Sequence, residues 1–304
     1  MKGKILEDFA VLNATTELER AGFGRKKGNK IYLHPVEALY LQMNEKINFG
    51  ELKNLIEWVK KKVEKFPEIY FVYEDLRKRG RKPRIEGDFV FAKKIFLPFS
   101  EMDIISFENI KENISRFGEV VVAIVDEESE VTYYVARELE AEGEQEESLP
   151  KLRGTLFKDR VITENIEIFQ KYFYGSEIGR FVALSLIESI YLLEKGFLEV
   201  ENADKLAEVV KSIEGFEEKL KVYKDLKNRK FVVKTGFKFG SDFRVYRRVE
   251  SIQQLPHSEF LVSVVKDSIK AKELANKVRL ANSVRKKPVL VWDGNYFIFE
   301  WMKV

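Results

Sequence analysis

The chain has 304 residues, of which 45% are hydrophobic and 34% are charged, the composition of a globular protein long enough for two domains. It contains no cysteine, which excludes disulfides, thiolate chemistry and cysteine-based zinc sites. No apolar run approaches the roughly 18 residues of a membrane span, and the N-terminal segment has too few apolar residues for a signal peptide. We therefore expect a cytoplasmic protein with no membrane partner.

The net charge of +3 hides an asymmetry between the two halves of the chain. Residues 1–150 hold 24 Lys and Arg against 29 Asp and Glu, whereas residues 151–304 hold 29 against 21. Residues 221–304 alone hold 19 against 8, a net charge of +11. A solvated surface without a partner would intersperse both signs, so this basic region indicates a nucleic-acid partner.

The N-terminal region has the pattern of short strands followed by helices. Residues 1–33 contain closely spaced glycines, which are typical of tight turns. A helix is predicted from Pro35, because proline is favoured in a first helical turn and the apolar spacing beyond it is helical. Two more helices are predicted, one over 52–63 and one that ends at Gly80. His34 precedes the first helix, and we interpret it as a structural residue.

The next part of the chain favours strands. A strand pattern covers Phe89–Phe96, and Pro98 is expected to end it because proline cannot donate to a ladder. Residues 119–125 are a buried-strand candidate, and Val131–Val135 is the predicted partner across an acidic turn. Residues 138–150 are strongly acidic and poor in apolar side chains, so we expect a linker or an exposed loop there.

The most informative stretch is the basic one from Lys221 to His257. It begins as a helix, turns at 228–230 and continues with a strand-like alternation of apolar residues. These apolar residues are Phe231, Val233, Phe237, Phe239 and Phe243. The stretch then contains Tyr246 and ends, directly after a proline, at His257. The basic run Arg285–Lys287 follows further along the chain.

The second half of the chain repeats the order of the first. Four short matches occur in the same order, at offsets between 150 and 167 residues. The pairs are Glu37–Leu41 with Glu188–Leu192, Val72–Arg77 with Val222–Lys227, Gly87–Phe89 with Ser241–Phe243, and Val122–Asp126 with Val289–Asp293. Similarity at a nearly fixed period indicates a repeated structural unit. We therefore predict a mixed α/β (α+β) fold that is a tandem duplication of one unit.

A comparison of the two copies singles out three polar residues. Tyr246 corresponds to Ala92, and the first copy has no histidine to match His257 and no lysine to match Lys286 or Lys287. Taken singly, the tyrosine could pack in a strand, the histidine could cap the next helix, and the lysine could be a solvated charge. Residues kept only for packing would not be expected to vanish together, so we predict a catalytic second copy and a scaffold first copy.

A tyrosine, a histidine and a lysine on one basic sheet could cut RNA. The RNA 2′-hydroxyl is the nucleophile, so the protein must supply a base for it, an acid for the 5′-oxygen and a cation for the charge at phosphorus. The products are a 2′,3′-cyclic phosphate and a 5′-hydroxyl end. Histidine, with a pKa of about 6.5, suits the acid role, whereas tyrosine, at about 10, needs nearby cations to favour its phenolate. Arg244, Arg247 and Arg248 flank Tyr246.

The motifs around these residues resemble the archaeal tRNA-intron endonucleases, the splicing endonuclease family, and in particular its homodimeric branch with two fused repeats per chain. The motifs are VYKDLKNRKFVVKTGFKFGSDFRVYRR, LPHSEFLV and VRLANSVRKK. In that family a Tyr, a His and a Lys in these motifs form the catalytic triad. The matching positions are Tyr246 as general base, His257 as general acid and Lys286 as charge stabiliser, with Lys287 as the alternative lysine.

The resemblance also implies a domain organisation. Each repeat of the family joins a helical and sheet subdomain to a nuclease-like α/β subdomain. Residues 1–145 would form the non-catalytic repeat and residues 146–304 the catalytic repeat. The expected subdomains are 1–80, 81–145, 153–220 and 221–304.

Partners and substrate are implied by the same resemblance. The family forms homodimers in which an acidic loop contacts a basic cleft of the partner chain. The residues that fit this loop are Asp126, Glu127, Glu128 and Glu130. The substrate class is precursor tRNA, from which introns are excised at bulge–helix–bulge sites, and no cofactor or metal is expected.

Relatives hold the bulge bases between a pair of arginines. Arg279 fits one of the pair, and Trp301 matches the other, which departs from the family pattern. A tryptophan can stack on a base, or it could simply pack at the end of a strand. Arg285 and Lys287 are further candidates for RNA binding.

Two other functions fit parts of the sequence. A non-catalytic RNA-binding module, or a structural partner subunit, would explain the basic charge but predicts no asymmetry between the copies. A metal-dependent nuclease needs clustered carboxylates at strand ends, and Asp242 is the main candidate for such a carboxylate in the second copy.

Overall fold

The computed structural model describes residues 1–304. Contacts between residues divide the chain into two compact units, each assembled from separate segments. Unit 1 contains Met1–Glu138, Asp267–Arg279 and Phe299–Val304, and unit 2 contains Leu139–Lys266 and Leu280–Ile298. No helix has the length and apolar character needed to cross a membrane.

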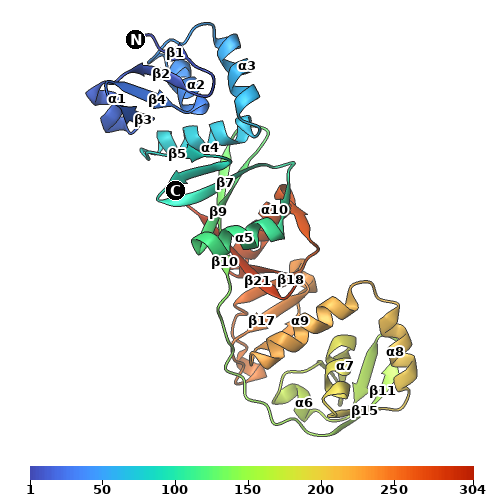
Figure 1. The fold of residues 1–304 in the computed structure, drawn as a ribbon. Coiled ribbons are helices and arrows are strands. Elements are labelled where there is room, and N and C mark those ends of the chain that lie inside the picture. The colour runs from blue at the N-terminus through green and yellow to red at the C-terminus, as the bar shows by residue number, and fades with distance from the viewer. The chain divides into compact units, whose positions relative to one another are not determined.

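The N-terminal part of unit 1 combines a small antiparallel sheet with helices (Figure 1). The strands are β1 (Lys4–Ile5), β2 (Ala10–Asn13), β3 (Arg25–Lys27) and β4 (Lys30–Leu33), in the order β1-β2-β4-β3. The helices are α1 (Thr16–Ala21), α2 (Pro35–Met43), α3 (Leu52–Lys62) and α4 (Phe66–Lys78). The three predicted helices of this region are confirmed, and their apolar residues share one buried cluster with the small sheet.

Five adjacent strands and a crossover helix follow in unit 1. The strands are β5 (Arg84–Glu86), β6 (Phe89–Ala92), β7 (Lys94–Ser100), β9 (Glu119–Val125) and β10 (Val131–Glu138), in the order β10-β9-β7-β6-β5. β7 and β9 are parallel, and α5 (Phe107–Phe117) lies in the connection between them, as parallel pairing requires. A separate two-stranded ladder joins β8 (Ile104–Ser106) to β19 (Ser268–Lys270).

Pro98 lies inside β7, so the expectation that it ends the strand is wrong. It pairs with Ala123 of β9. On the other side of β7, the ladder with β6 stops at Phe96. Only one side of the strand is paired at the proline, so its missing N–H removes no ladder bond from the other side.

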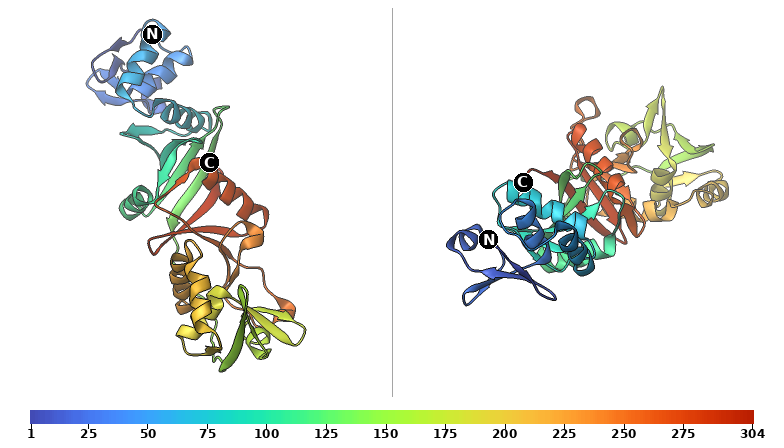
Figure 2. Two further views of the ribbon diagram at one scale, coloured as in Figure 1. Left: turned by 90° about the vertical axis from the view of Figure 1, so that its right-hand side faces the viewer. Right: turned by 90° about the horizontal axis from the view of Figure 1, so that it is seen from above.

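The first part of unit 2 has the same plan as the start of unit 1. Its strands are β11 (Leu152–Phe157), β12 (Arg160–Thr163), β13 (Ser176–Ile178), β14 (Phe181–Ser185) and β15 (Leu198–Val200), in the order β13-β14-β12-β11-β15. Its helices are α6 (Glu167–Gln170), α7 (Leu186–Glu194), α8 (Ala203–Lys211) and α9 (Phe216–Asn228). In Figure 2 these yellow-green strands and yellow helices form one body.

Five further strands carry or adjoin the predicted catalytic residues. They are β16 (Val232–Thr235), β17 (Phe243–Tyr246), β18 (Phe260–Val264), β20 (Lys287–Trp292) and β21 (Asn295–Met302), adjacent in that order. β18 and β20 are parallel, and α10 (Ala271–Ser283) lies in the connection between them, as α5 does between β7 and β9. The short 3₁₀ helix η2 (Ile252–Gln254) precedes β18.

The predicted strand does not continue through Phe237 and Phe239. These residues form a 3₁₀ turn, η1 (Phe237–Phe239), closed by hydrogen bonds from Phe239 N–H to Gly236 O at 2.8 Å and from Gly240 N–H to Phe237 O at 3.1 Å. Gly240 has a φ of 61°, a left-handed conformation that glycine adopts at little cost. The turn reverses the chain between β16 and β17, which the alternation of apolar residues alone does not reveal.

The fold confirms the mixed α/β class and the duplication. Helices α2 and α7 both begin with a capping box whose glutamate is buried. Glu37 accepts from Gly24 N–H at 3.1 Å, and Glu188 accepts from Gly175 N–H at 3.0 Å. His34 caps α2 through Nδ1, which accepts a backbone hydrogen bond at 3.3 Å. Its structural role is therefore confirmed, and burial lowers its pKa to about 4, which favours the neutral ring that can accept.

The acidic segment 138–150 has no helix or strand beyond Glu138, as expected for a linker or loop, and Glu140, Glu142 and Glu144 are exposed, but hydrogen bonds hold its backbone in place. Gly143 N–H donates to Arg229 O at 2.8 Å, and Gln145 N–H donates to Lys230 O at 2.9 Å. A β-carbon on Gly143 would lie 2.1 Å from the Lys230 carbonyl oxygen, so only glycine permits this approach. The repeat boundary at residues 145–146 stays a prediction.

Candidate active site

The ends of three strands bring the predicted catalytic residues to one edge of a sheet. β17 ends at Tyr246, and its neighbour β18, which begins at Phe260, runs antiparallel to it. β18 is parallel to β20, with Phe260 opposite Lys287. The end of β17 and the beginnings of β18 and β20 therefore lie together. His257 and Lys286 stand just before the two strand beginnings, so both lie at the edge where Tyr246 is found.

Tyr246 is buried, with 4% of its surface exposed. It belongs to a small apolar cluster with Phe173, Val232 and Val249. Its ring meets that of Phe173 edge-to-face, at 6.0 Å between centroids and 80° between planes. Burial raises the pKa of the Tyr246 hydroxyl, and the Arg244 guanidinium opposes this shift.

Lys286 is also buried, with 7% of its surface exposed. Its backbone N–H donates to Ala281 O at 2.9 Å, which closes the C-terminal end of α10. Its Nζ donates to Ser258 O at 3.3 Å and lies 5.6 Å from the centroid of the Phe239 ring. Burial, and secondarily the Arg244 charge, lowers the pKa of the Lys286 ammonium.

His257 is exposed in the irregular segment between η2 and β18. It does not cap a helix, because the element that follows is the strand β18. The next residue is Ser258, whose carbonyl accepts the hydrogen bond from Lys286 Nζ. The exposed imidazole of His257 can meet a substrate, and the buried ammonium of Lys286 can supply fixed charge.

Arg244 joins the site, although the sequence marked it only as one of three flanking cations. Alternation along β17 places it on the same face as Tyr246, and its guanidinium lies 5.9 Å from the tyrosine ring centroid. Its Nε is buried and has no hydrogen-bond partner. A buried donor on a cation without an acceptor can bind an incoming anion such as a phosphate.

The exposed cations of the site differ from Lys286. Arg285 and Lys287 are exposed, and Lys287 Nζ lies 3.7 Å from a carboxylate oxygen of Glu259. The same carboxylate accepts from Arg247 at 2.5 Å. Glu259 therefore neutralises part of the positive charge beside the strand ends.

A cavity of about 480 Å³ in unit 2 is lined in part by Lys234, Phe237, Asp242 and Arg244. Asp242 is the carboxylate on which the metal-dependent alternative depended. One of its oxygens pairs with Lys219 Nζ at 2.7 Å, and the other accepts from a backbone N–H at 2.8 Å. Both oxygens are therefore already engaged within the protein.

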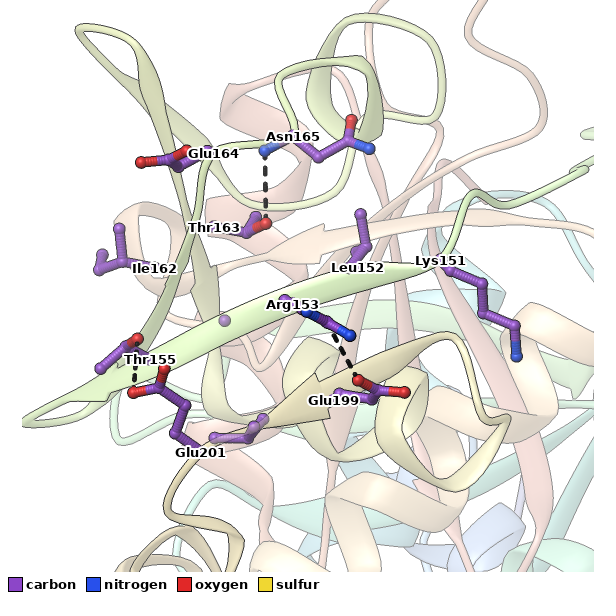
Figure 3. Close-up of a pocket in the computed structure, with 12 residues that line it drawn as sticks. Lys151, Leu152, Arg153, Thr155, Ile162, Thr163, Glu164, Asn165, Glu199 and Glu201 are labelled. Carbon is purple, nitrogen blue, oxygen red and sulfur yellow. Dashed lines mark hydrogen bonds and ion pairs between the residues drawn. The ribbon is translucent and has the colours of Figure 1, made fainter.

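A second cavity of unit 2, of about 660 Å³, lies along β11, β12 and β15 (Figure 3). Two of its charged side chains, Arg153 and Glu199, pair at 3.3 Å. None of the predicted site residues lines it. This cavity is separate from the candidate active site.

The two predicted base-stacking residues belong to unit 1. Arg279 is exposed on α10, and Trp301 is 53% exposed near the end of β21. The Lys303 ammonium lies 5.5 Å from the centroid of the Trp301 ring. Trp301 is therefore not buried at its strand end.

The acidic turn between β9 and β10 is also in unit 1. Asp126 Oδ1 accepts from the N–H groups of Glu128 at 3.0 Å and Glu130 at 2.9 Å. The Asp126 carboxylate thus holds the turn together. Glu127, Glu128 and Glu130 are exposed.

Comparisons with known proteins find one family over most of the chain. The model of the tRNA intron endonuclease catalytic C-terminal domain matches residues 216–296. The model of the N-terminal domain of the same family matches twice, at 1–57 and at 152–211. This double match agrees with the duplication.

Similar chains named tRNA-splicing endonuclease occur in several archaea. That of Methanosarcina mazei is 36% identical over 90% of this chain and 89% of its own. That of Methanococcoides burtonii is 33% identical over 98% of both, and that of Haloarcula marismortui is 36% identical over 93% of this chain and 91% of its own. By class, the chain is an endonuclease. More particularly, it belongs to the tRNA intron endonuclease family.

Proposed function

We propose that the chain excises introns from precursor tRNA by cutting RNA without a metal ion, leaving 2′,3′-cyclic phosphate and 5′-hydroxyl ends. Family membership supports the reaction class. The observation that carries the chemistry is the convergence of the end of β17 with the beginnings of β18 and β20, next to Tyr246, His257 and Lys286.

In this proposal Tyr246 removes the proton of the 2′-hydroxyl, and His257 gives a proton to the leaving 5′-oxygen. Lys286 stabilises the charge that gathers on the phosphate. Burial raises the pKa of Tyr246 and so works against its phenolate. The guanidinium of Arg244 works in the opposite direction, and its unpartnered Nε is suited to the same phosphate.

Two observations support Lys286 rather than Lys287 as the catalytic cation. The Lys286 ammonium is buried and donates to the carbonyl of the residue after His257. Lys287 is exposed and lies beside Glu259, which would offset its charge at the phosphate. A cation in a desolvated position stabilises developing charge more strongly than an exposed one.

The proposed substrate carries a bulge–helix–bulge, and the proposed active species is a homodimer with two sites for the two bulges. The exposed glutamates of the acidic turn are suited to a basic cleft of a second chain. The exposed side chains of Arg279 and Trp301 are suited to stack on splayed bulge bases.

Cleavage of a short bulge–helix–bulge RNA in the presence of EDTA tests the proposal, with the new ends identified chemically. We expect two cuts with cyclic phosphate and 5′-hydroxyl ends. Tight binding without cleavage would favour the RNA-binding module. Cleavage that needs added metal would overturn the metal-free mechanism.

A further inference from the structure

We propose that Phe173 is a positioning residue that fixes the Tyr246 ring for proton abstraction, an assignment that rests on the proposed role of Tyr246. Phe173 lies between α6 and β13, outside the strands that carry the three catalytic candidates. It is 5% exposed, and its ring meets Tyr246 edge-to-face at 6.0 Å. This geometry is one that aromatic pairs prefer, and it limits rotation of the tyrosine ring.

The backbone of Phe173 is strained. Its φ is 61°, in the left-handed region where a side chain other than that of glycine is disfavoured. The corresponding residue of the first copy, 151 positions earlier, is Gly22, with a φ of 71°. The alignment is firm, because Gly24 and Gly175 stand two residues later, both with positive φ, and each donates to the buried glutamate of its copy.

The tyrosine and its aromatic neighbour are absent together from the first copy. Where the second copy has Phe173 and Tyr246, the first has Gly22 and Ala92. The scaffold copy therefore has the residue that suits the backbone, and the copy with the candidate base has a bulky ring in the same unfavourable conformation. Strained residues persist where the surrounding structure imposes them, and they cluster at functional sites.

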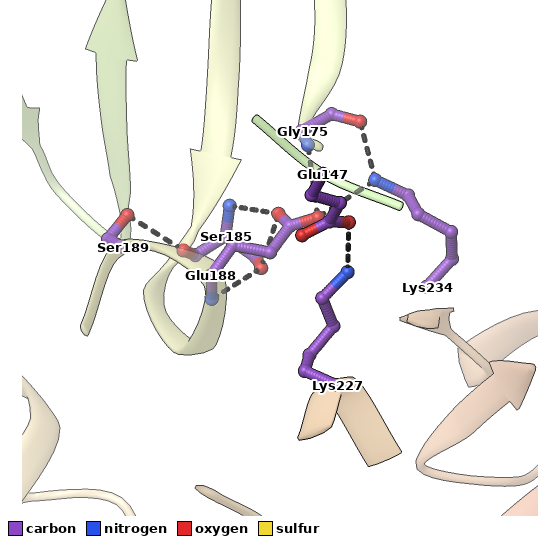
Figure 4. Close-up of polar contacts among 7 residues, drawn as sticks. All are labelled: Glu147, Gly175, Ser185, Glu188, Ser189, Lys227 and Lys234. Carbon is purple, nitrogen blue, oxygen red and sulfur yellow. Dashed lines mark hydrogen bonds and ion pairs between the residues drawn. The ribbon is translucent and has the colours of Figure 1, made fainter. Parts of the chain in front are cut away.

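A buried cation also packs against the Phe173 ring. Lys234 Nζ lies 5.1 Å from the ring centroid. The ammonium is itself held by Glu188 Oε1 at 2.9 Å and by Gly175 O at 2.7 Å (Figure 4). Lys234 has 8% of its surface exposed, so this hydrogen-bonded cation is shielded from solvent. The Tyr246 ring thus contacts the Phe173 ring, which itself packs against the buried ion pair of Lys234 and Glu188.

The test is a double-mutant cycle on cleavage rate. Single-turnover cleavage of the bulge–helix–bulge RNA would be measured in EDTA for the unchanged chain, Phe173→Leu, Tyr246→Phe and the double variant. We expect Phe173→Leu to slow cleavage about 10-fold, because small misplacements of a reacting group are costly. The Kd for RNA should change by less than about 2-fold, because phosphate contacts dominate affinity. In the Tyr246→Phe background the same change should have no further effect.

Phe169→Leu is the matched control. The Phe169 ring centroid lies 5.8 Å from that of Phe173, and Phe169 packs against the same apolar cluster. This variant should lower the thermal unfolding midpoint as Phe173→Leu does, but leave the cleavage rate unchanged. Equal slowing by Phe173→Leu in both backgrounds, or no slowing in either, would overturn the positioning role. If Tyr246→Phe alone cleaves at the normal rate, the proposed base is wrong, and the assignment of Phe173 falls with it.

Discussion

Two of the candidate catalytic side chains, those of Tyr246 and Lys286, lie in surroundings that oppose their charged forms. Burial raises the pKa of Tyr246, which disfavours the phenolate, and lowers the pKa of Lys286, which disfavours the ammonium. The charge of Arg244 favours the Tyr246 phenolate and opposes the Lys286 ammonium. The negative charge of a bound phosphate would stabilise the ammonium of Lys286 and the guanidinium of Arg244, whose mutual repulsion disfavours the ammonium in the free protein.

Replacing Lys286 with methionine should stabilise the free protein while removing cleavage. At neutral pH the buried ammonium costs stability, because its folded pKa lies below the unfolded value of about 10.5. We expect a gain of about 1 kcal/mol, the usual size for relieving a destabilising functional residue, and a loss of cleavage of about 100-fold or more.

Thermal unfolding of Lys286→Met and of the unchanged chain, measured as a function of pH, checks the sign of this change in stability. The gain should be full well below the lowered pKa and shrink as the pH rises through it, because the lysine then loses its proton in the folded chain. Lys287→Met is the control, since its ammonium is exposed and should change stability by less than about 0.5 kcal/mol. A less stable Lys286→Met at neutral pH would contradict the prediction.

Tyr246→Phe and His257→Ala should separate chemistry from binding. Each should reduce single-turnover cleavage by about 100-fold to 10,000-fold, the usual contribution of a general acid or base. The affinity for RNA, measured by filter binding in EDTA, should stay within about 3-fold. Arg285→Ala should do the converse, weakening binding with little effect on the rate. Parallel loss of binding and cleavage in the first two variants would count against their assignment.

Comparison of the two copies within the sequence singles out Tyr246, His257 and the pair Lys286 and Lys287 as candidates, because their counterparts are missing from the first copy. The choice of Lys286 over Lys287 comes from the family resemblance. The comparison of copies could not find Phe173. An apolar residue beside other aromatics looks like core, and only its positive φ and the tyrosine ring beside it distinguish it. The unpartnered Nε of Arg244 is equally invisible without coordinates.

At the scale of elements, two buried ion pairs hold the catalytic repeat together. Lys227 of α9 pairs with Glu147 of the acidic segment, and Lys234 of β16 pairs with Glu188 of α7 (Figure 4). Glu147 also accepts from the Tyr174 hydroxyl at 2.9 Å. The acidic segment thus carries one of the charges that the interior of the repeat requires.

Glu147→Gln should therefore cost far more stability than the same change one residue earlier. The Lys227 side chain is 3% exposed, and a buried lysine that loses its partner costs about 3 kcal/mol. Glu146 pairs with Lys230 on the surface, where Glu146 is 82% exposed, so Glu146→Gln should leave the stability nearly unchanged. Urea unfolding of the two variants gives the comparison. Equal losses would show that the Lys227 pair is not needed for stability.

Element type was predictable where a periodic pattern was long, as in α2 and α4. The prediction failed where the structure of a segment depended on a neighbouring strand or on the backbone angle of the next residue. Pro98 is tolerated in β7 because β6 has already ended on one side. The Phe237–Phe239 turn depends on a left-handed glycine after it. Neither the extent of a partner strand nor a backbone angle is encoded in a local apolar pattern.

At the scale of the whole molecule, the offsets between matching segments revealed the duplication, and the double match of the N-terminal family model agrees with them. The two copies also differ in net charge. The acidic first half and the basic C-terminal region would suit contacts between two chains, in agreement with the homodimer that we propose from the family resemblance and the acidic turn.

Neutralising the acidic turn should dissociate that dimer. A variant with Glu127→Gln, Glu128→Gln and Glu130→Gln keeps Asp126, which holds the turn, and removes the three exposed charges. We expect sedimentation velocity to show a dimer for the unchanged chain and a Kd for dimerisation weaker by about 10-fold or more for the variant.

The control for this variant removes three exposed charges elsewhere, by Glu140→Gln, Glu142→Gln and Glu144→Gln. Its dimerisation should be unchanged. A monomeric unchanged chain, or equal weakening by both triple variants, would rule out the acidic turn as the contact.

The composition of unit 1 has a consequence for synthesis of the chain. Although the unit starts at the first residue, Asp267–Arg279 and Phe299–Val304 also belong to it, and β19 is the pairing partner of β8. A ribosome adds about 5–20 residues per second, so β8 emerges many seconds before β19 exists. During that time the strands up to β18 are made, and β8 has no β19 with which to pair.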